Sequence, residues 1–406
     1  MKKRFHKVLI EPIKEVSSPI IEIEQTGQLS GFLLLNALFL TLLLANIPMS
    51  GSAYIKFWVS PLVPALNAIS AQEVINKGLM TLFMLEIGLD LKKELTQGEL
   101  QTYQRASLPF FGAIGGLVVP IIIFCFLNQE QSILSGWIIP TTTDIALSLG
   151  ILKLLGNKVP SFIKAFFVAL AIIDDLLALL LLVIFYLPTV GSLKIVLVLL
   201  SIIFLGALKY FKNTSLAFHF FIGGFLWWSM VQAGFPSAIS GIITALSIPI
   251  NRIDELKRWI YMPVNYLIVP LFVFANVAVA INLESLEFLQ ESHVKGVLIG
   301  LLLGKPLGIV LTTWLVVRLK FVQLPPNINW VQIIGCGILA GTGVTMAIYL
   351  TEHTYLSMEI RDFIKIGAIL ASLTSVFFST MIFINSTSIA NLFHWSFLRV
   401  LFFRKT

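Results

Sequence analysis

The chain alternates long apolar runs with short polar segments from about residue 31 to residue 385. A membrane-spanning helix needs about 20 mostly apolar residues, and fewer where the helix is broken or tilted. No low-complexity tract or long polar linker interrupts the alternation. We therefore predict a single membrane domain at 31–385, with a segment at 1–30 before it and a tail at 386–406 after it. The predicted spans are 31–48, 74–91, 107–127, 134–152, 161–187, 193–211, 216–234, 237–250, 259–281, 295–318, 330–351 and 361–385.

The composition excludes a water-soluble protein. Of the 406 residues, 57% are hydrophobic and 12% are charged, whereas soluble domains carry about 25% charged residues. The 32 Phe residues and the many Leu and Ile residues could not all be buried in one soluble core. Cys125 and Cys336 both lie within apolar runs, so they support neither a disulfide framework nor a cysteine metal site. These features predict an all-α polytopic membrane protein.

The basic residues give the orientation of the spans. The net charge of +7 is spread thinly between apolar runs, so it forms no continuous basic face for nucleic acid. If both termini are cytoplasmic, 21 Lys and Arg residues lie on the cytoplasmic side and five on the external side. Because basic residues concentrate in cytoplasmic loops, this asymmetry predicts an even number of spans with both termini in the cytoplasm.

Six ionisable residues lie within predicted spans, where a charged side chain costs at least ~2.5–3.5 kcal/mol. Asp174 and Asp175 are neighbours in the middle of an apolar run. Adjacent side chains on a helix point about 100° apart, so this pair can face two environments, one a lysine and the other an aqueous funnel. A helix-packing ion pair is the alternative reading. The other four residues are Lys77, Glu86, Asp144 and Lys305.

Two predicted spans contain residues that interrupt helices. The fourth span includes IIPTTTDIALSLG, in which Pro140 lacks a backbone donor and the threonine hydroxyls can bond the freed carbonyls near Asp144. The eleventh span includes GCGILAGTGVTMAIYL, with four glycines near its centre. Broken helices at corresponding positions of two halves point to a transporter site. Close helix packing explains the glycines of the eleventh span equally well.

Lys305 lies at a third distorted point, between Gly304 and Pro306. It is separated from Arg318 by about 20 Å of helix, which is too deep for its ammonium to snorkel to that side. Snorkelling to the opposite, external interface is the alternative to a functional role.

The motifs of these spans resemble those of the bacterial NhaA-type Na⁺/H⁺ antiporters. The resemblance extends in order over nearly the whole chain, and the combination of motifs is highly specific. It rests on GLDLKKEL at 88–95, GWIIPTTTDIALSLGILKLLGNKVP at 136–160, LAIIDDL at 170–176, YLIVPLFVFAN at 266–276, GKPLGI at 304–309 and GILAGTGVTMAIYL at 337–350.

The resemblance implies an architecture and a set of site residues. It implies twelve helices, with spans three to five and ten to twelve as inverted repeats and with the fourth and eleventh spans unwound where they cross. Asp175 matches the family's ion-binding aspartate, and Asp174 matches the proton-linked neighbour that pairs with the lysine. Thr143 lies beside the crossing, where Asp144 balances positive helix ends and Lys305 balances negative ones.

The implied activity is secondary active antiport of Na⁺ or Li⁺ against protons. It proceeds by alternating access, with Na⁺ (or Li⁺) and protons competing for Asp174 and Asp175, and it serves pH and sodium homeostasis. This activity needs no covalent chemistry and no cofactor, so the protein is not expected to be an enzyme. The resemblance places the chain in the lipid bilayer of the bacterial inner membrane, and it is compatible with a homodimer.

Some positions depart from the family pattern. Family members usually carry an acid where this chain has Lys77, and an apolar residue where it has Glu86. Pro236 replaces a family histidine, and a Glu/His-rich entry to the ninth span reads LKRWIY at 256–261. Because the replaced groups are associated with pH sensing, we do not expect the usual activation by alkaline pH. Lys77 and Glu86 are candidate modulators.

Other function classes fit the residues less well. A sodium-coupled organic-solute symporter is the main alternative, because a core of crossed broken helices could serve it too. An intramembrane aspartyl protease needs acids from separate helices, typically one in a GxGD motif, and this chain has adjacent acids and no GxGD. Deep carboxylates with a lysine partner favour occlusion of one ion over the rapid exit that a channel requires.

Overall fold

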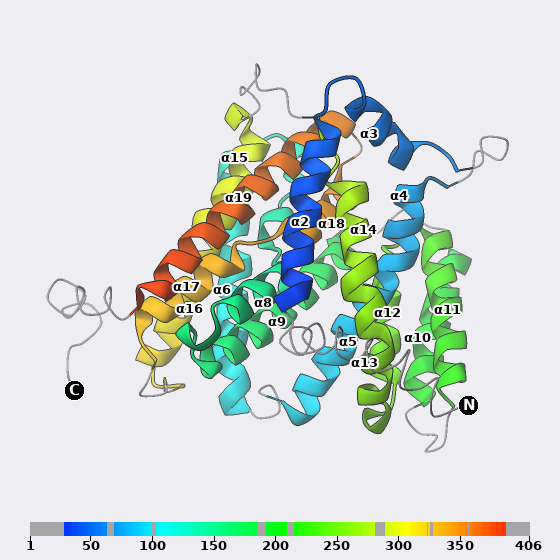
Figure 1. The fold of residues 1–406 in the computed structure, drawn as a ribbon. Coiled ribbons are helices and arrows are strands. Elements are labelled where there is room, and N and C mark those ends of the chain that lie inside the picture. Colours follow the sequence, from blue (N-terminus) through cyan, green and yellow to red (C-terminus); the bar gives the residue numbers. More distant parts are fainter. Residues whose placement is uncertain are drawn as a thin grey trace, which may run out of the picture.

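The computed structural model describes residues 28–62, 69–98, 103–185, 192–208, 215–280, 289–322, 324, 328–355 and 357–386. Within these ranges every regular element is a helix, and an isolated bridge between Pro61 and Ser70 is the only strand-like pairing. The predicted all-α architecture is thereby confirmed (Figure 1). The predicted segments 1–30 and 386–406 lie almost entirely outside the described residues.

Every predicted span coincides with one helix or with a series of helices. The spans formed by one helix are α2 (Gln28–Ala45), α6 (Tyr103–Leu127), α9 (Ser161–Phe185), α10 (Ser192–Ala207), α11 (Leu216–Ala233), α12 (Ile239–Ser247) and α19 (Met358–Ile384). Among the described residues, six segments are each long and apolar enough to cross a membrane. A bent pair of helices, α17 and α18, makes a seventh.

Three long spans are interrupted by π-helical turns, which insert one extra residue into a helical turn and often occur at functional sites. The turn η2 (Ile75–Leu79) joins α4 (Ala71–Val74) to α5 (Met80–Gln97). The others are η6 (Val264–Ile268), between α13 (Ile250–Pro263) and α14 (Val269–Asn276), and η8 (Gly300–Gly304), between α15 (Ser292–Ile299) and α16 (Lys305–Arg318). The distortion expected around Lys305 is therefore present, because η8 ends at the residue before it.

Two spans are broken outright. The fourth consists of α7 (Gln131–Leu134), the 3-10 turn η3 (Ile139–Thr141) and α8 (Ile145–Leu154). The eleventh consists of α17 (Trp330–Ala340) and α18 (Val344–Thr354), which are bent by 42° at their junction. Both breaks fall where proline or glycine interrupts the apolar pattern.

The structure differs from the sequence prediction at two places. The helix α3 (Gly51–Val59) was not predicted, because its nine residues are too few to register as a span. The ninth span begins at Ile250 instead of 259, because the charged residues before 259 already belong to the helix α13. The helix α12 itself covers only about 14 Å at 1.5 Å per residue, which is less than the hydrocarbon thickness.

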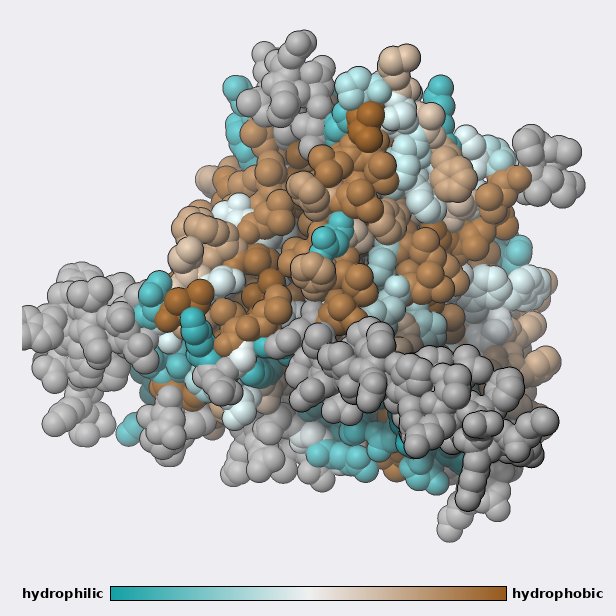
Figure 2. Space-filling view, in the orientation of Figure 1, coloured by the Kyte–Doolittle hydropathy of each residue, from teal (hydrophilic) through white to brown (hydrophobic). Residues whose placement is uncertain are grey.

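The helices pack around the broken spans. In Figure 1, α15, α16, α17 and α19 lie on one side of the molecule and α10, α11, α12 and α13 on the other. The helices α6 and α16 make a close crossing at Gly115 and Gly308, where a Cβ on either residue would overlap the backbone of the other. Hydrophobic residues dominate the middle of the surface in Figure 2, and polar residues gather toward both the upper and the lower edges. This distribution suits a bilayer around the middle of the molecule.

Candidate functional site at the helix crossing

The two helix breaks meet in the interior. Thr142 has an extended backbone, with φ −78° and ψ 153°, and Asp144 leads into α8. The Asp144 backbone N–H donates to the Thr342 carbonyl at 2.6 Å, and the Ser148 and Thr342 hydroxyls lie 2.5 Å apart. These contacts join residues about 200 positions apart in the chain, so the predicted crossing of two broken helices is present.

Asp144 joins the N-termini of two half-helices. Its Oδ1 accepts from the Leu147 N–H at 3.0 Å in the first turn of α8, and its Oδ2 accepts from the Thr345 N–H at 3.2 Å in the first turn of α18. Helix N-termini carry unpaired N–H groups and a partial positive charge. One buried carboxylate therefore satisfies donors of both helices and opposes both positive ends, which is the role that the family resemblance implies for Asp144.

Lys305 and Asp174 form a fully buried ion pair. The side chains are 0% and 1% exposed, and Lys305 Nζ contacts Asp174 Oδ2 and also the Thr143 hydroxyl. The Thr143 hydroxyl lies 2.8 Å from Asp174 Oδ2 and 3.1 Å from the Ala340 carbonyl, at the last residue of α17. Thr143 thus connects the ion pair to the negative end of a broken helix.

Asp175 faces the same crossing from α9 but is poorly satisfied. Its Oδ1 accepts a long hydrogen bond of 3.4 Å from the Thr143 backbone N–H, and the side chain is 2% exposed. Asp175 Oδ2 and Asp174 Oδ1 are both buried without a hydrogen-bond partner among the described residues. An unsatisfied buried acceptor costs about 1–3 kcal/mol, and more when it is charged. Two buried oxygens on adjacent residues of α9 are thus left without a hydrogen bond from the described residues.

The charges of the crossing do not balance. Asp144, Asp174 and Asp175 face one ammonium, Lys305, and all four side chains are buried. When all are ionised, the group carries two excess negative charges in a low-dielectric interior. Helix N-termini offset part of the Asp144 charge, but the two carboxylates of α9 share one lysine. A bound cation or protons must supply the remaining positive charge.

The structure brings five of the seven predicted site residues together and leaves two apart. Glu86, in α5, accepts from the Asn265 side-chain amide at 2.8 and 3.0 Å, on the π-helical turn η6. Lys77 lies 2.7 Å from Glu73 and is 51% exposed. Lys77 and Glu86 thus have different partners, and neither joins the crossing.

The sequence analysis missed two groups that support the crossing. Ser372, in α19, accepts from the Gly343 N–H at 2.9 Å and donates to the Ala368 carbonyl at 2.7 Å, so it holds the break before α18. Ser372, Ser375 and Ser379 are all fully buried, and their spacing along α19 would have revealed an inward polar stripe. At the other end of α18, Glu352 binds Arg361 at 2.5 Å and Lys365 at 2.7 Å.

Comparisons with known proteins find similar sequences along most of the chain. A family model described as Na⁺/H⁺ antiporter 1 matches residues 22–383. The Na⁺/H⁺ antiporter NhaA 1 of Flavobacterium johnsoniae is 38% identical over 360 residues, which cover 87% of this chain and 92% of that protein. The NhaA antiporter of Flavobacterium psychrophilum is 37% identical over 91% of this chain and 97% of its own length. That of Shewanella amazonensis is 37% identical over 84% of this chain and 91% of its own length.

Proposed function

Because this chain belongs to the Na⁺/H⁺ antiporter 1 family, we propose that it is a secondary active transporter that exports Na⁺ or Li⁺ in exchange for protons. The observation that carries the proposal is the pair of unpartnered oxygens on Asp174 and Asp175. They are buried beside a single lysine, at the point where two broken helices meet. Such a position suits a small cation or protons, and not a large organic solute.

In the proposed mechanism, Na⁺ and protons compete for the same carboxylates. Asp175 supplies the primary cation ligand through Oδ2, and Asp174 supplies a second through Oδ1. A cation between them would weaken the attraction of Asp174 for Lys305 and would displace protons from the site. Protons arriving from the other side would restore the ion pair and expel the cation. Either occupant neutralises the same excess negative charge, so the two exclude each other.

The way the breaks are joined supports alternating access at the crossing. Asp144 holds α8 and α18 by their first turns, while Thr143 touches both the ion pair and the end of α17. A change in occupancy at Asp174 and Asp175 would therefore act on three half-helix ends at once. Broken helices can respond because the residues between their halves lack a continuous hydrogen-bond ladder.

We further propose that the chain lies in the bacterial inner membrane with both termini in the cytoplasm, where it serves pH and sodium homeostasis. Lys92 and Lys93 near the end of α5, Lys153 near the end of α8, and Arg252 and Lys257 in α13 are basic residues at the predicted cytoplasmic ends of spans. Their concentration there supports this orientation.

Everted membrane vesicles from cells that express the protein test the proposal. Respiration acidifies the vesicle interior and quenches a pH-sensitive dye, and adding NaCl with no organic solute should restore the fluorescence. Vesicles from cells that carry the empty vector provide the background. A sodium-coupled symporter would release no protons under these conditions, and that outcome would refute antiport.

A further inference from the structure

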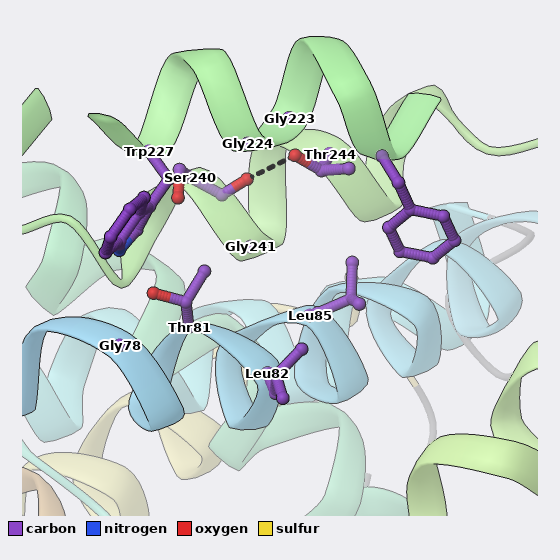
Figure 3. Close-up of a pocket in the computed structure, with 11 residues that line it drawn as sticks. Gly78, Thr81, Leu82, Leu85, Gly223, Gly224, Trp227, Ser240, Gly241 and Thr244 are labelled. Atoms are coloured by element: carbon purple, nitrogen blue, oxygen red, sulfur yellow. Dashed lines mark hydrogen bonds between the residues drawn. The ribbon is translucent and has the colours of Figure 1, made fainter. Parts of the chain in front are cut away.

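A cavity of about 250 Å³ opens between α5, α11 and α12, away from the helix crossing. Figure 3 shows Leu82 and Leu85 of α5 on one side and the glycine-containing stretches of α11 and α12 on the other. No charged residue lines it. The cavity contributes no group to the proposed transport site, so it requires a separate explanation.

Its polar side chains direct their donors to backbone carbonyls and not into the cavity. The Trp227 ring N–H and the Thr81 hydroxyl both donate to the Lys77 carbonyl, at 2.6 and 3.1 Å. Ser240 donates to the Ser237 carbonyl at 2.6 Å, and Thr244 donates to the Ser240 carbonyl at 2.7 Å, the bond dashed in Figure 3. The lining therefore presents a mostly apolar surface, which an apolar occupant matches.

The cavity faces the surface that a bilayer would cover. Leu82 is 41% exposed and Phe220 is 39% exposed. A Cβ added at Gly78 or Gly224 would meet no atom within 4 Å, so open space lies in front of both glycines. Apolar cavities stay free of water. In a membrane the hydrocarbon that reaches this opening is an acyl chain.

A cationic side chain stands at one end of this surface. Lys77 directly precedes Gly78, which lines the cavity, and the Lys77 side chain is 51% exposed. An ammonium has three donors, and the hydrogen bond to Glu73 at 2.7 Å uses one. Lysine ammonium groups attract lipid phosphates near a membrane surface. The apolar cavity thus complements an acyl chain of a phospholipid, and the Lys77 ammonium complements its phosphate.

We propose that this cavity binds one acyl chain of a phospholipid from the leaflet on the α4 side, with the lipid phosphate at Lys77. The chain runs along α5 from Gly78 toward Leu85 and fills the space in front of Gly224. The bound lipid joins α5 to α11 and α12. This proposal does not depend on antiport, because none of its residues lies at the helix crossing.

Native mass spectrometry of the full chain in detergent, titrated with the anionic lipid palmitoyl-oleoyl phosphatidylglycerol, tests the proposal. Gly224→Leu should fill the cavity and abolish the tightest lipid-binding step. Gly206→Leu in α10 is the matched control, because a Cβ there also meets open space but lies outside the cavity. It should bind lipid as the unmodified chain does. Lys77→Ala should weaken that step about fivefold, the effect of one basic residue near a lipid surface.

Gly78→Leu provides a second cavity-filling variant and should reproduce the loss even if Gly224→Leu folds poorly. Dioleoylglycerol, which has acyl chains but no phosphate, should bind about fivefold more weakly than the phospholipid to the unmodified chain and equally to Lys77→Ala. Equal lipid binding by Gly224→Leu, Gly78→Leu and Gly206→Leu would overturn the cavity site. Equal binding of the two lipids to the unmodified chain would overturn the role of Lys77.

Discussion

At the residue scale, the three carboxylates of the proposed site differ in how many hydrogen-bond and ion-pair partners each one has. Asp144 has two backbone N–H donors, and Asp174 has Lys305 and Thr143. Asp175 has one long hydrogen bond, and its second oxygen has no partner among the described residues. Of the three acids at the crossing, Asp175 therefore gains most from a bound cation. The adjacent acids were visible in the sequence, but their unequal satisfaction required the structure.

We predict that Asp175→Asn abolishes Na⁺-driven proton release. The amide keeps the volume of the side chain but removes the negative charge that a cation requires. The measurement is dye dequenching in everted vesicles at saturating NaCl, with the amount of inserted protein checked by immunoblot. Asp254→Asn, at an exposed ion pair with Lys93, is the control and should retain full activity. Robust exchange by Asp175→Asn at unchanged Na⁺ affinity would falsify the assignment.

A second residue-scale prediction concerns the pair Asp174 and Lys305. Removing one member leaves an uncompensated buried charge, which costs about 3–5 kcal/mol. Removing both should cost much less than the sum of Asp174→Asn and Lys305→Ala, so thermal melts of the double-mutant cycle should be strongly non-additive.

The exposed pair Lys93–Asp254 supplies the matched cycle for that experiment. Its atoms are 2.7 Å apart, but the side chains are 43% and 68% exposed. Exposed pairs contribute about 0–1 kcal/mol, so this cycle should be close to additive. Similar additivity in the buried pair would contradict its proposed energetic importance.

At the element scale, local sequence predicted where helices break but not what the breaks contact. Pro140 and the glycines near Gly341 mark the two interruptions, and the structure has breaks at both. The bond from Asp144 to Thr342 links distant segments, so no local pattern reveals it, and the resemblance implied only that the two spans cross. Neither a local pattern nor the resemblance indicated the contact between Glu86 and Asn265, which are 179 positions apart. The helix α3 was missed because it is shorter than any span.

We predict that Ser372→Ala raises the apparent Na⁺ KM several-fold while leaving the maximal rate within about twofold. The change leaves the buried Gly343 N–H without its acceptor, at a cost of about 1–3 kcal/mol, and it loosens the break that carries Thr342. Ser379→Ala is the control, because that hydroxyl lies equally deep in α19 but bonds only its own helix. Equal effects of the two substitutions would show that Ser372 has no special role in positioning the crossing.

At the scale of the whole molecule, large apolar side chains lie on the surface, and the acids of the proposed transport site lie in the interior. Large side chains such as Phe126, Phe221 and Trp259 are 79%, 76% and 77% exposed, which suits contact with lipid and not with water. Asp144, Asp174 and Asp175 are gathered at one crossing, while the departures from the family pattern lie elsewhere: Lys77 in η2, the buried Glu86 in α5, Pro236 before α12, and 256–261 in α13. The proposed transport core is thus intact in a protein whose peripheral charges differ. This separation lets the pH response be predicted from the core alone.

We predict that the protein lacks a steep activation by alkaline pH. Pro236, Lys257 and Arg258 stand where the family has groups associated with pH sensing, and proline, lysine and arginine are not residue types that ordinarily change charge between pH 5 and 8. Only competition at the carboxylates then remains. A lower pH should raise the apparent Na⁺ KM, by up to about tenfold per pH unit for each proton displaced, with no collapse of the maximal rate under mildly acidic conditions. Exchange rates across a pH series at graded NaCl measure both quantities.

A steep loss of the rate at saturating NaCl within one pH unit of neutrality would reveal another sensor. Glu86→Gln would then test the buried carboxyl beside Asn265, because it keeps the side-chain volume and removes the ionisable group.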